Sequence, residues 1–308
     1  MWQPNTPERR AWIIPIGVDT SAVPSLNLRY SSNDAKRLGD DLSQRLEAGH
    51  QFKSVVAMPF MSDAQHPDGA AKEAIRKAIT GLAGTGPDSA GPNDLVIVSF
   101  SGHGHAGPGG RFYLIPSDAG KGVSDHAGNL RADPASRTRL LSESISSDDL
   151  SRWFRDVDAG QIVLIVDACQ SAAVLGGEGF KPGPMGSRGL GQLTYDKGLT
   201  ILAATQADNV ALESGKVGQG LLTYALTHDG LERMAADWQP KDGRIDLREW
   251  LKYGVWTACR TCGRRSRLAS CRPTGNFGCW WPKMAGSPVR ESGRNLRSST
   301  FRMISRTS

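Results

Sequence analysis

One histidine and one cysteine follow the two most apolar segments of the sequence. His103 comes shortly after residues 95–100 (LVIVSF), and Cys169 comes shortly after residues 162–166 (IVLIV). A thiol attacks a carbonyl at neutral pH only when a neighbouring base or cation raises its thiolate fraction. An imidazole can act as that base and later protonate the leaving amine. The two residues together predict nucleophilic catalysis, provided that the fold brings them together.

Strand-like and helix-like segments alternate along the first 254 residues. Apolar runs predict strands over residues 11–18, 52–59, 95–100, 111–116, 162–166 and 199–204. Helical periodicity predicts helices over residues 33–46, 70–82, 148–157 and 220–232, and Asp246 with Glu249 predicts a capping box that opens another. This order predicts an α/β fold with a mostly parallel sheet and helices on both faces. The chemistry of such sheets lies beyond the carboxyl ends of the strands, where both candidate residues stand.

The segment that carries His103 is expected to be a glycine-rich loop. Gly102 and Gly104 flank the histidine and would let the backbone turn sharply and approach a substrate. Backbone N–H groups near Gly104 and Cys169 are candidates for stabilising an oxyanion. His105 is predicted to be a solvated loop residue. A single histidine is usually a turn residue and a single cysteine a small core residue, so the hypothesis rests on the pair.

Both segments resemble the two catalytic motifs of the caspase/metacaspase family of cysteine peptidases, peptidase C14 type, in its bacterial caspase-like branch. Residues 100–104 (FSGHG) are similar to the family's histidine motif. Residues 167–171 (DACQS) are similar to its cysteine motif, with Gln170 where the family usually has histidine. Further similar segments are residues 33–35 (NDA), 113–119 (YLIPSDA) and 220–224 (GLLTY). The resemblance covers residues 11–253 and implies a caspase-like three-layer sandwich.

The resemblance implies a role for each matching residue. His103 would be the general base and acid, and Cys169 the nucleophile that forms an acyl-enzyme. The backbone N–H groups of Gly104 and Cys169 would form the oxyanion hole. Asp167 would line the S1 pocket, where a carboxylate favours Arg or Lys at P1; its alternative role is a structural cap after the strand. No cofactor and no metal site are expected, while activation by calcium stays open.

Two long segments rich in Gly, Pro and Ser are expected to be loops, over residues 117–138 and 171–198. The second lies where the family has its inter-subunit linker, and it is predicted to be flexible and linker-like. Its basic residues Lys181, Arg188 and Lys197 are candidate sites of self-cleavage by a peptidase that accepts a basic P1 residue. A passive surface loop is the alternative.

The sequence from residue 255 onward differs in composition from the rest. It holds 11 of the 37 Lys and Arg residues but one of the 31 Asp and Glu residues, so the net charge of +6 divides into −4 and +10. We expect a leader (1–10), a peptidase domain (11–254) and a tail (255–308) that is disordered or frameshifted, because out-of-frame translation of a GC-rich gene enriches Arg, Cys and Trp. The alternatives are a basic interaction tail and a zinc site at Cys259, Cys262, Cys271 and Cys279.

These observations predict a cysteine endopeptidase with a polypeptide substrate. One cysteine in the first 254 residues is no disulfide framework, so a cytoplasmic location is expected. No run approaches the ~18 apolar residues of a membrane span, so no membrane partner is expected. The alternative functions are a non-catalytic scaffold of the caspase fold and a nucleic-acid-binding protein that uses the tail. Nucleic acid is otherwise not an expected partner, and the sequence predicts no particular oligomeric state.

Overall fold

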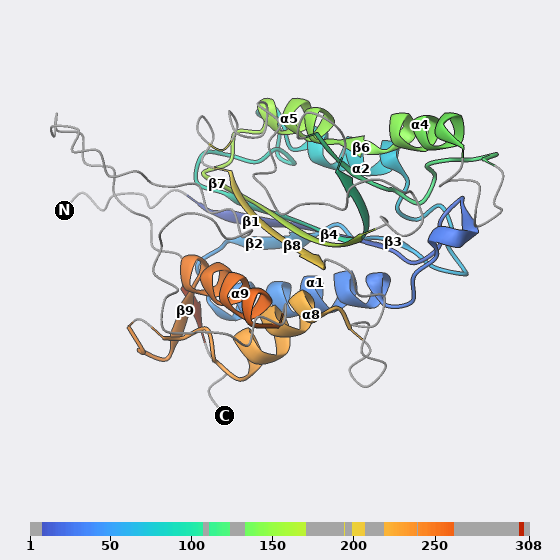
Figure 1. Cartoon of the computed structure of the whole chain (residues 1–308). Coiled ribbons are helices and arrows are strands. Elements are labelled where there is room, and N and C mark those ends of the chain that lie inside the picture. The colour runs from blue at the N-terminus through green and yellow to red at the C-terminus, as the bar shows by residue number, and fades with distance from the viewer. Residues whose placement is uncertain are drawn as a thin grey trace, which may run out of the picture.

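The computed structural model describes residues 8–106, 111–123, 133–170, 194, 199–206, 219–238, 240–261 and 302–304. Its centre is one sheet with helices on both faces (Figure 1). The strands of this sheet are β1 (Arg10–Val18), β2 (Ser54–Ala57), β3 (Phe60–Ser62), β4 (Leu95–Ala106), β5 (Phe112–Leu114), β6 (Ile145–Ser146), β7 (Gln161–Gln170) and β8 (Thr200–Gln206). Strand β1 pairs in parallel with β2, β3 and β4, and β7 pairs in parallel with β4 and β8. The predicted α/β class with a mostly parallel sheet is confirmed; β5 and β6 pair antiparallel.

The helices form two layers (Figure 1). One layer holds α2 (Lys72–Gly81), α4 (Pro134–Glu143) and α5 (Ser147–Arg155), and the other holds α1 (Ser31–Ala48), α8 (Leu221–Tyr224), the π-helix η3 (Ala225–Glu232) and α9 (Leu247–Thr261). A 3-10 turn η1 (Pro24–Leu26) follows β1, and β9 (Arg244–Asp246) pairs with β10 (Arg302–Ile304) in a separate sheet. No helix in the described ranges is long and apolar enough to cross a membrane.

Side chains that alternate along each strand divide the hydrophobic core between the two faces of the sheet. Along β4, Val96, Val98 and Phe100 pack in the core beneath α2 and α5. Leu95 and Ile97 pack in the core beneath α1 and α9. Successive side chains of a strand point to opposite faces, so the odd-numbered positions at the end of β4 belong to the α1 face. This face is where the site described below is built.

Two predicted loops were wrong in part. Strand β4 continues to Ala106, so the residues around His103 form part of the sheet rather than a glycine-rich loop. The predicted loop over 117–138 ends early, because α4 begins at Pro134. The Asp133 side chain caps this helix by accepting from the N–H groups of Ala135 at 2.9 Å and Ser136 at 3.2 Å. A capping aspartate followed by proline at the first helical position is a readable signal for a helix start.

The last predicted helix begins where the capping box placed it. The Glu249 N–H donates to Asp246 Oδ1 at 2.7 Å, and the Asp246 N–H donates to Glu249 Oε2 at 3.1 Å. Helix α9 then continues to Thr261, past the change of composition at residue 255. The predicted helix over 220–232 is also present, but it turns into a π-helix after Tyr224. Within that π-helix the Leu226 carbonyl accepts from the Trp250 indole at 2.9 Å, which ties the segment to α9.

Candidate active site

The predicted catalytic residues lie on adjacent strands. Strands β4 and β7 run parallel, and their register pairs His103 with Cys169. Neighbouring strands lie roughly 4.8 Å apart, so the two backbones are direct neighbours. His103 is half-buried. The side chain of Cys169 lies outside the part that the structure describes, and the roles of the two residues therefore stay predictions.

The glycines beside His103 serve packing rather than a turn. A Cβ at Gly104 would lie 2.9 Å from the Cβ of Ala168 on β7, closer than side chains pack. Gly104 therefore lets β4 keep its register with β7 up to His103 and Cys169, which we call the predicted catalytic pair. On the other side of β4, the Ile115 N–H donates to the His103 carbonyl at 3.0 Å. The histidine backbone is thus held from both sides.

His105 is not the solvated loop residue that the sequence predicted. It lies in β4, half-buried, in register with Tyr113 of β5, and the two rings have centroids 6.5 Å apart. Burial, and secondarily the positive charge of Arg137, lower the pKa of His105 below its usual value. A histidine with a lowered pKa is neutral at neutral pH, so His105 adds no positive charge beside the predicted catalytic pair.

Two buried carboxylates lie on the same face of the sheet as His103 and Cys169, two residues before them along the strands. Asp167 pairs in register with Ser101, two positions before Cys169 and His103, and is 7% exposed. Asp34 of α1 is 3% exposed, and the Ser101 hydroxyl donates to its Oδ2 at 3.3 Å. We call Asp34 and Asp167 the carboxylate pair. Asp167 lies inside β7, which continues to Gln170, so it is not a cap after the strand. Its place in an S1 pocket stays a prediction.

The first turn of α8 closes over the carboxylate pair. The Gly220 N–H donates to both oxygens of Asp34, at 2.9 and 3.0 Å. The Thr223 N–H and hydroxyl both donate to Asp167 Oδ2 at 3.4 Å. A Cβ at Gly220 would lie 2.7 Å from Asp34 Oδ2 and 2.8 Å from Asp167 Oδ2. Gly220 therefore approaches both carboxylates because it has no side chain.

The carboxylate pair resists ionisation. Burial raises the pKa of Asp167 to about 6, although its bonds from Thr223 oppose the rise. Burial raises the pKa of Asp34 to about 8, and repulsion from Asp167 adds to the rise. Within the described chain, neither carboxylate forms an ion pair with Lys or Arg. A cation that entered between them would favour the ionised forms, as opposite charges do.

The sequence interpretation missed Asp34 as a site residue. A signal was present, since Asp34 falls on the apolar stripe of its helix, one turn before Leu38 and in line with Leu42 and Leu46. A carboxylate on the buried stripe of an amphipathic helix needs a reason, because charged side chains are almost never buried unpaired. The segment with Gly220 and Thr223 was identified as family-like, but without a role.

Several predicted residues stay untested. The possible self-cleavage sites Lys181, Arg188 and Lys197 lie outside the described residues. So do the side chains of the four cysteines proposed as an alternative zinc site. The backbone N–H groups of Gly104 and Cys169 keep their predicted oxyanion role without a test. Among the residues whose side chains are described, no group of three His, Cys, Asp or Glu could hold a metal ion.

Comparison with known proteins agrees with the resemblance of the motifs. Residues 10–235, well over half of the chain, match a family model described as the caspase domain of peptidase C14. The match spans the sheet from β1 to β8, both carboxylates and the first turn of α8. A search of curated proteins found no match.

Proposed function

Because the chain belongs to the caspase-domain family of peptidases, peptidase C14, we propose that it is a cysteine endopeptidase that cleaves after Arg or Lys. Family membership supports a cysteine peptidase that acts on polypeptides. The observation that carries the finer proposal is the register of β4 and β7, which pairs His103 with Cys169 directly beside the carboxylate pair. The proposal includes action in the cytoplasm, which rests on the cysteine content of the first 254 residues. It also includes the absence of a bound cofactor, which rests on the family resemblance.

The proposed reaction uses the imidazole twice. His103 accepts the thiol proton of Cys169, and the thiolate attacks the carbonyl carbon of the scissile bond. The N–H groups of Gly104 and Cys169 stabilise the negative oxygen of the tetrahedral intermediate. Collapse breaks the C–N bond, the protonated His103 gives its proton to the leaving amine, and an acyl-enzyme remains. A water molecule, deprotonated by His103, then hydrolyses the thioester and regenerates the thiol.

The carboxylate pair supports the preference for a basic P1 residue. Two buried carboxylates without a positive partner are costly unless they stay protonated. A guanidinium or ammonium group would supply the missing charge, and a planar guanidinium suits carboxylate oxygens best. The pair stands two strand positions before the predicted catalytic pair on the α1 face. An acidic P1 side chain would meet like charge there, so cleavage after Asp is disfavoured.

The test compares the wild type with Cys169→Ala and His103→Ala on fluorogenic peptides that end in Arg, Lys or Asp. We expect cleavage after Arg and Lys, and a loss of at least about a thousandfold in kcat/KM for both variants. The matched control is His66→Ala, because His66 lies on an exposed loop. Equal rates in the wild type and Cys169→Ala would overturn the peptidase; preference for Asp would overturn the P1 assignment.

Self-cleavage is tested on the purified chain. We expect the wild type, but not Cys169→Ala, to be cut within residues 171–198, after Lys181, Arg188 or Lys197. Mass spectrometry of the fragments identifies the bond. A wild-type chain that stays intact, like Cys169→Ala, would contradict self-cleavage without bearing on cleavage of other polypeptides.

A further inference from the structure

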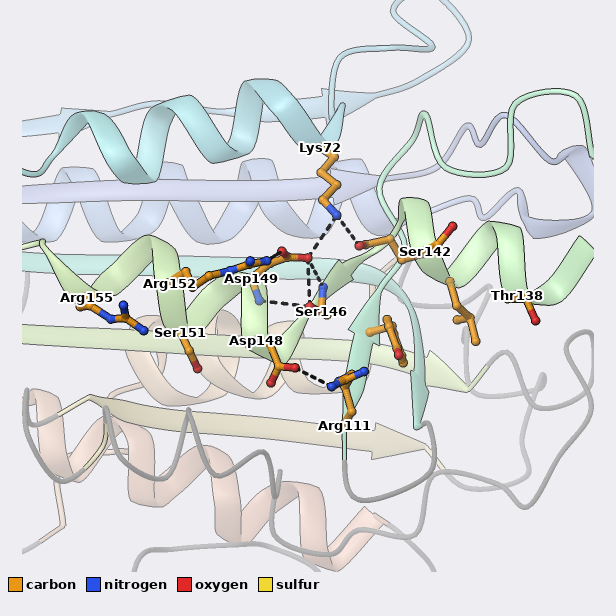
Figure 2. Close-up of a pocket in the computed structure, with 13 residues that line it drawn as sticks. Lys72, Arg111, Thr138, Ser142, Ser146, Asp148, Asp149, Ser151, Arg152 and Arg155 are labelled. Carbon is orange, nitrogen blue, oxygen red and sulfur yellow. Dashed lines mark hydrogen bonds and ion pairs between the residues drawn. The ribbon is translucent and has the colours of Figure 1, made fainter.

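A polar groove lies between α4, α5 and the antiparallel strands β5 and β6 (Figure 2). Its volume is about 720 Å³, within the range of roughly 300–1,000 Å³ typical of ligand sites. Its charged lining consists of Lys72, Arg111, Asp148, Asp149, Arg152 and Arg155, and we call it the basic groove. Among the described residues that line it, there is neither His103 nor a member of the carboxylate pair, so it is a separate site.

Positive charge exceeds negative charge in the basic groove. Lys72 Nζ lies 3.1 Å from Asp149 Oδ2, and Arg152 pairs with the same carboxylate. Arg111 Nη2 lies 2.8 Å from Asp148 Oδ2. The lining therefore holds four cationic side chains and two carboxylates (Figure 2). The surplus favours a ligand that carries negative charge.

Arg155 is the cation that the groove leaves available. It is exposed, at the last turn of α5, and makes no ion pair within the described ranges. An arginine offers five N–H donors in a planar fork that matches a carboxylate. Arg155 can therefore bind a ligand carboxylate without giving up a partner in this part of the chain.

The hydroxyl groups of the groove favour a peptide over a simple anion. The hydroxyls of Thr138, Ser142 and Ser151 donate to carbonyls of their own helices, at 2.8, 2.7 and 2.9 Å. Their protons are thus engaged, and their lone pairs remain to accept from a ligand. The dianion of a phosphate monoester offers only acceptors, and inorganic phosphate offers at most one or two O–H donors. An acidic peptide offers carboxylates for the arginines and backbone N–H groups for the hydroxyl oxygens.

We propose that the basic groove binds an acidic segment of the polypeptide substrate. The proposal rests on the proposed function, because it names a feature of that substrate. Strand β5 connects the two sites: Tyr113 lines the groove and pairs in register with His105, two positions from His103. The Ile115 N–H, one residue beyond β5, bonds to the His103 carbonyl at 3.0 Å. A polypeptide seated in the groove therefore lies against the strand that supports the catalytic histidine.

The first test measures binding without cleavage. A short fluorescein-labelled polyglutamate is titrated with the full chain carrying Cys169→Ala, and anisotropy is recorded. We expect Arg155→Glu to weaken binding about tenfold, because it places like charge against the ligand. Asp148→Asn should strengthen binding several-fold, because it removes a competing carboxylate and frees Arg111. The matched control is Arg248→Glu on α9, an exposed charge reversal on the opposite face of the sheet, which should bind like the parent.

Several outcomes would overturn the proposal. They are an absence of binding, equal weakening by Arg248→Glu, and weaker binding by Asp148→Asn. Inorganic phosphate that displaces the peptide at the same concentration as free glutamate peptide would show a general anion site instead of a peptide site. Lost binding in Arg155→Glu at unchanged melting temperature supports the groove directly.

The second test separates the groove from the proposed function. With Cys169 intact, a substrate with an acidic segment should have a several-fold lower KM than the same substrate with a neutral segment, and Arg155→Glu should abolish that difference. An equal KM for both substrates would overturn the role of the groove in substrate binding. A chain that binds polyglutamate but cleaves no peptide would refute the proposed function and leave an acidic-peptide site.

Discussion

Buried carboxylates lie at both ends of the central sheet, and the two ends neutralise them differently. At the end where β4 begins, Asp94 is 2% exposed and forms an ion pair with Arg10 at 3.0 Å. It also accepts from the backbone N–H groups of Arg10 at 2.7 Å and Gly91 at 2.9 Å. At the opposite end, Asp34 and Asp167 are 3% and 7% exposed and accept only from neutral donors in the described chain.

The difference separates a carboxylate that has a structural partner from two carboxylates that we propose to bind substrate. Asp94 ties the start of β4 to β1 with a cation that the chain itself supplies, so nothing further is needed there. The carboxylate pair is held in place by N–H and hydroxyl groups, and burial raises its pKa values. Groups whose pKa values are shifted by burial without a permanent partner mark functional sites more often than structural ones. The predictions below test this contrast.

The largest effect is expected from removing the charge of Asp167. Asp167→Asn keeps the shape and an oxygen that can accept from Thr223. It removes one of the two carboxylates that we propose to face a basic P1 side chain. We expect kcat/KM for Arg peptides to fall about a hundredfold. Steady-state kinetics on matched peptides ending in Arg and in citrulline, its neutral analogue, measure the effect. An equal fall for both peptides would show that Asp167 acts on the dyad rather than on P1.

Replacing Asp94 should lower the stability of the protein and leave its substrate preference unchanged. Asp94→Asn leaves the Arg10 guanidinium without its counter-charge, so we expect a loss of about 2 kcal/mol in the free energy of unfolding. Urea denaturation of the full chain measures this value. The ratio of kcat/KM between Arg and Lys peptides should not change, because Asp94 lies at the other end of the sheet. A changed ratio would break the division between structural and binding charges.

The fold was predictable because its signals are local. Apolar runs and amphipathic stretches predicted β1, α1, α2, β4, α5, β7 and β8, and the apolar run of β7 was the strongest strand signal in the sequence. The length of β4 was not predictable, because its last residues include two glycines, which are depleted in strands. Tertiary contacts extend the strand. Gly104 packs against Ala168 of β7, and β5 pairs with residues 104–106.

The candidate site was predictable only in part. Strand order and motif resemblance placed His103 beside Cys169 before the register showed it. The carboxylate pair needs α1 and β7 to meet beneath α8, across 186 residues between Asp34 and Gly220. No local pattern encodes that contact. The basic groove likewise joins residues from α2, β5, α4 and α5, which share no motif.

A smaller loss of activity is expected from adding a methyl group at Gly220, beside the carboxylate pair. Gly220→Ala would place a Cβ 2.7 Å from Asp34 Oδ2 and 2.8 Å from Asp167 Oδ2, which forces the carboxylates or the first turn of α8 to move. We expect kcat/KM for Arg peptides to fall about tenfold. The matched control is Gly81→Ala, because a Cβ there meets nothing within 4 Å. Equal activity of Gly220→Ala and the wild type would mean that a P1 side chain does not enter beside Gly220.

The smallest effect is a pH-dependent gain in stability from Asp34→Asn. In the unfolded chain the Asp34 carboxyl ionises near its ordinary pKa of 3.8, whereas the folded protein raises that pKa to about 8. Between these values the folded state binds the extra proton, so wild-type stability falls as pH rises toward 8. Asparagine does not ionise in this pH range, so Asp34→Asn removes this dependence of stability on pH. The variant should therefore gain on the wild type by about 1 kcal/mol in the free energy of unfolding between pH 5 and pH 6.

Melting temperatures of both chains across this pH range measure the gain. Asp94→Asn is the control from the other end of the sheet, because its carboxylate has a cation and its replacement should destabilise the protein at both pH values. A constant difference between Asp34→Asn and the wild type would mean that Asp34 is ionised throughout. A cation would then already neutralise the carboxylate pair in the free protein, and the two ends of the sheet would not differ in kind.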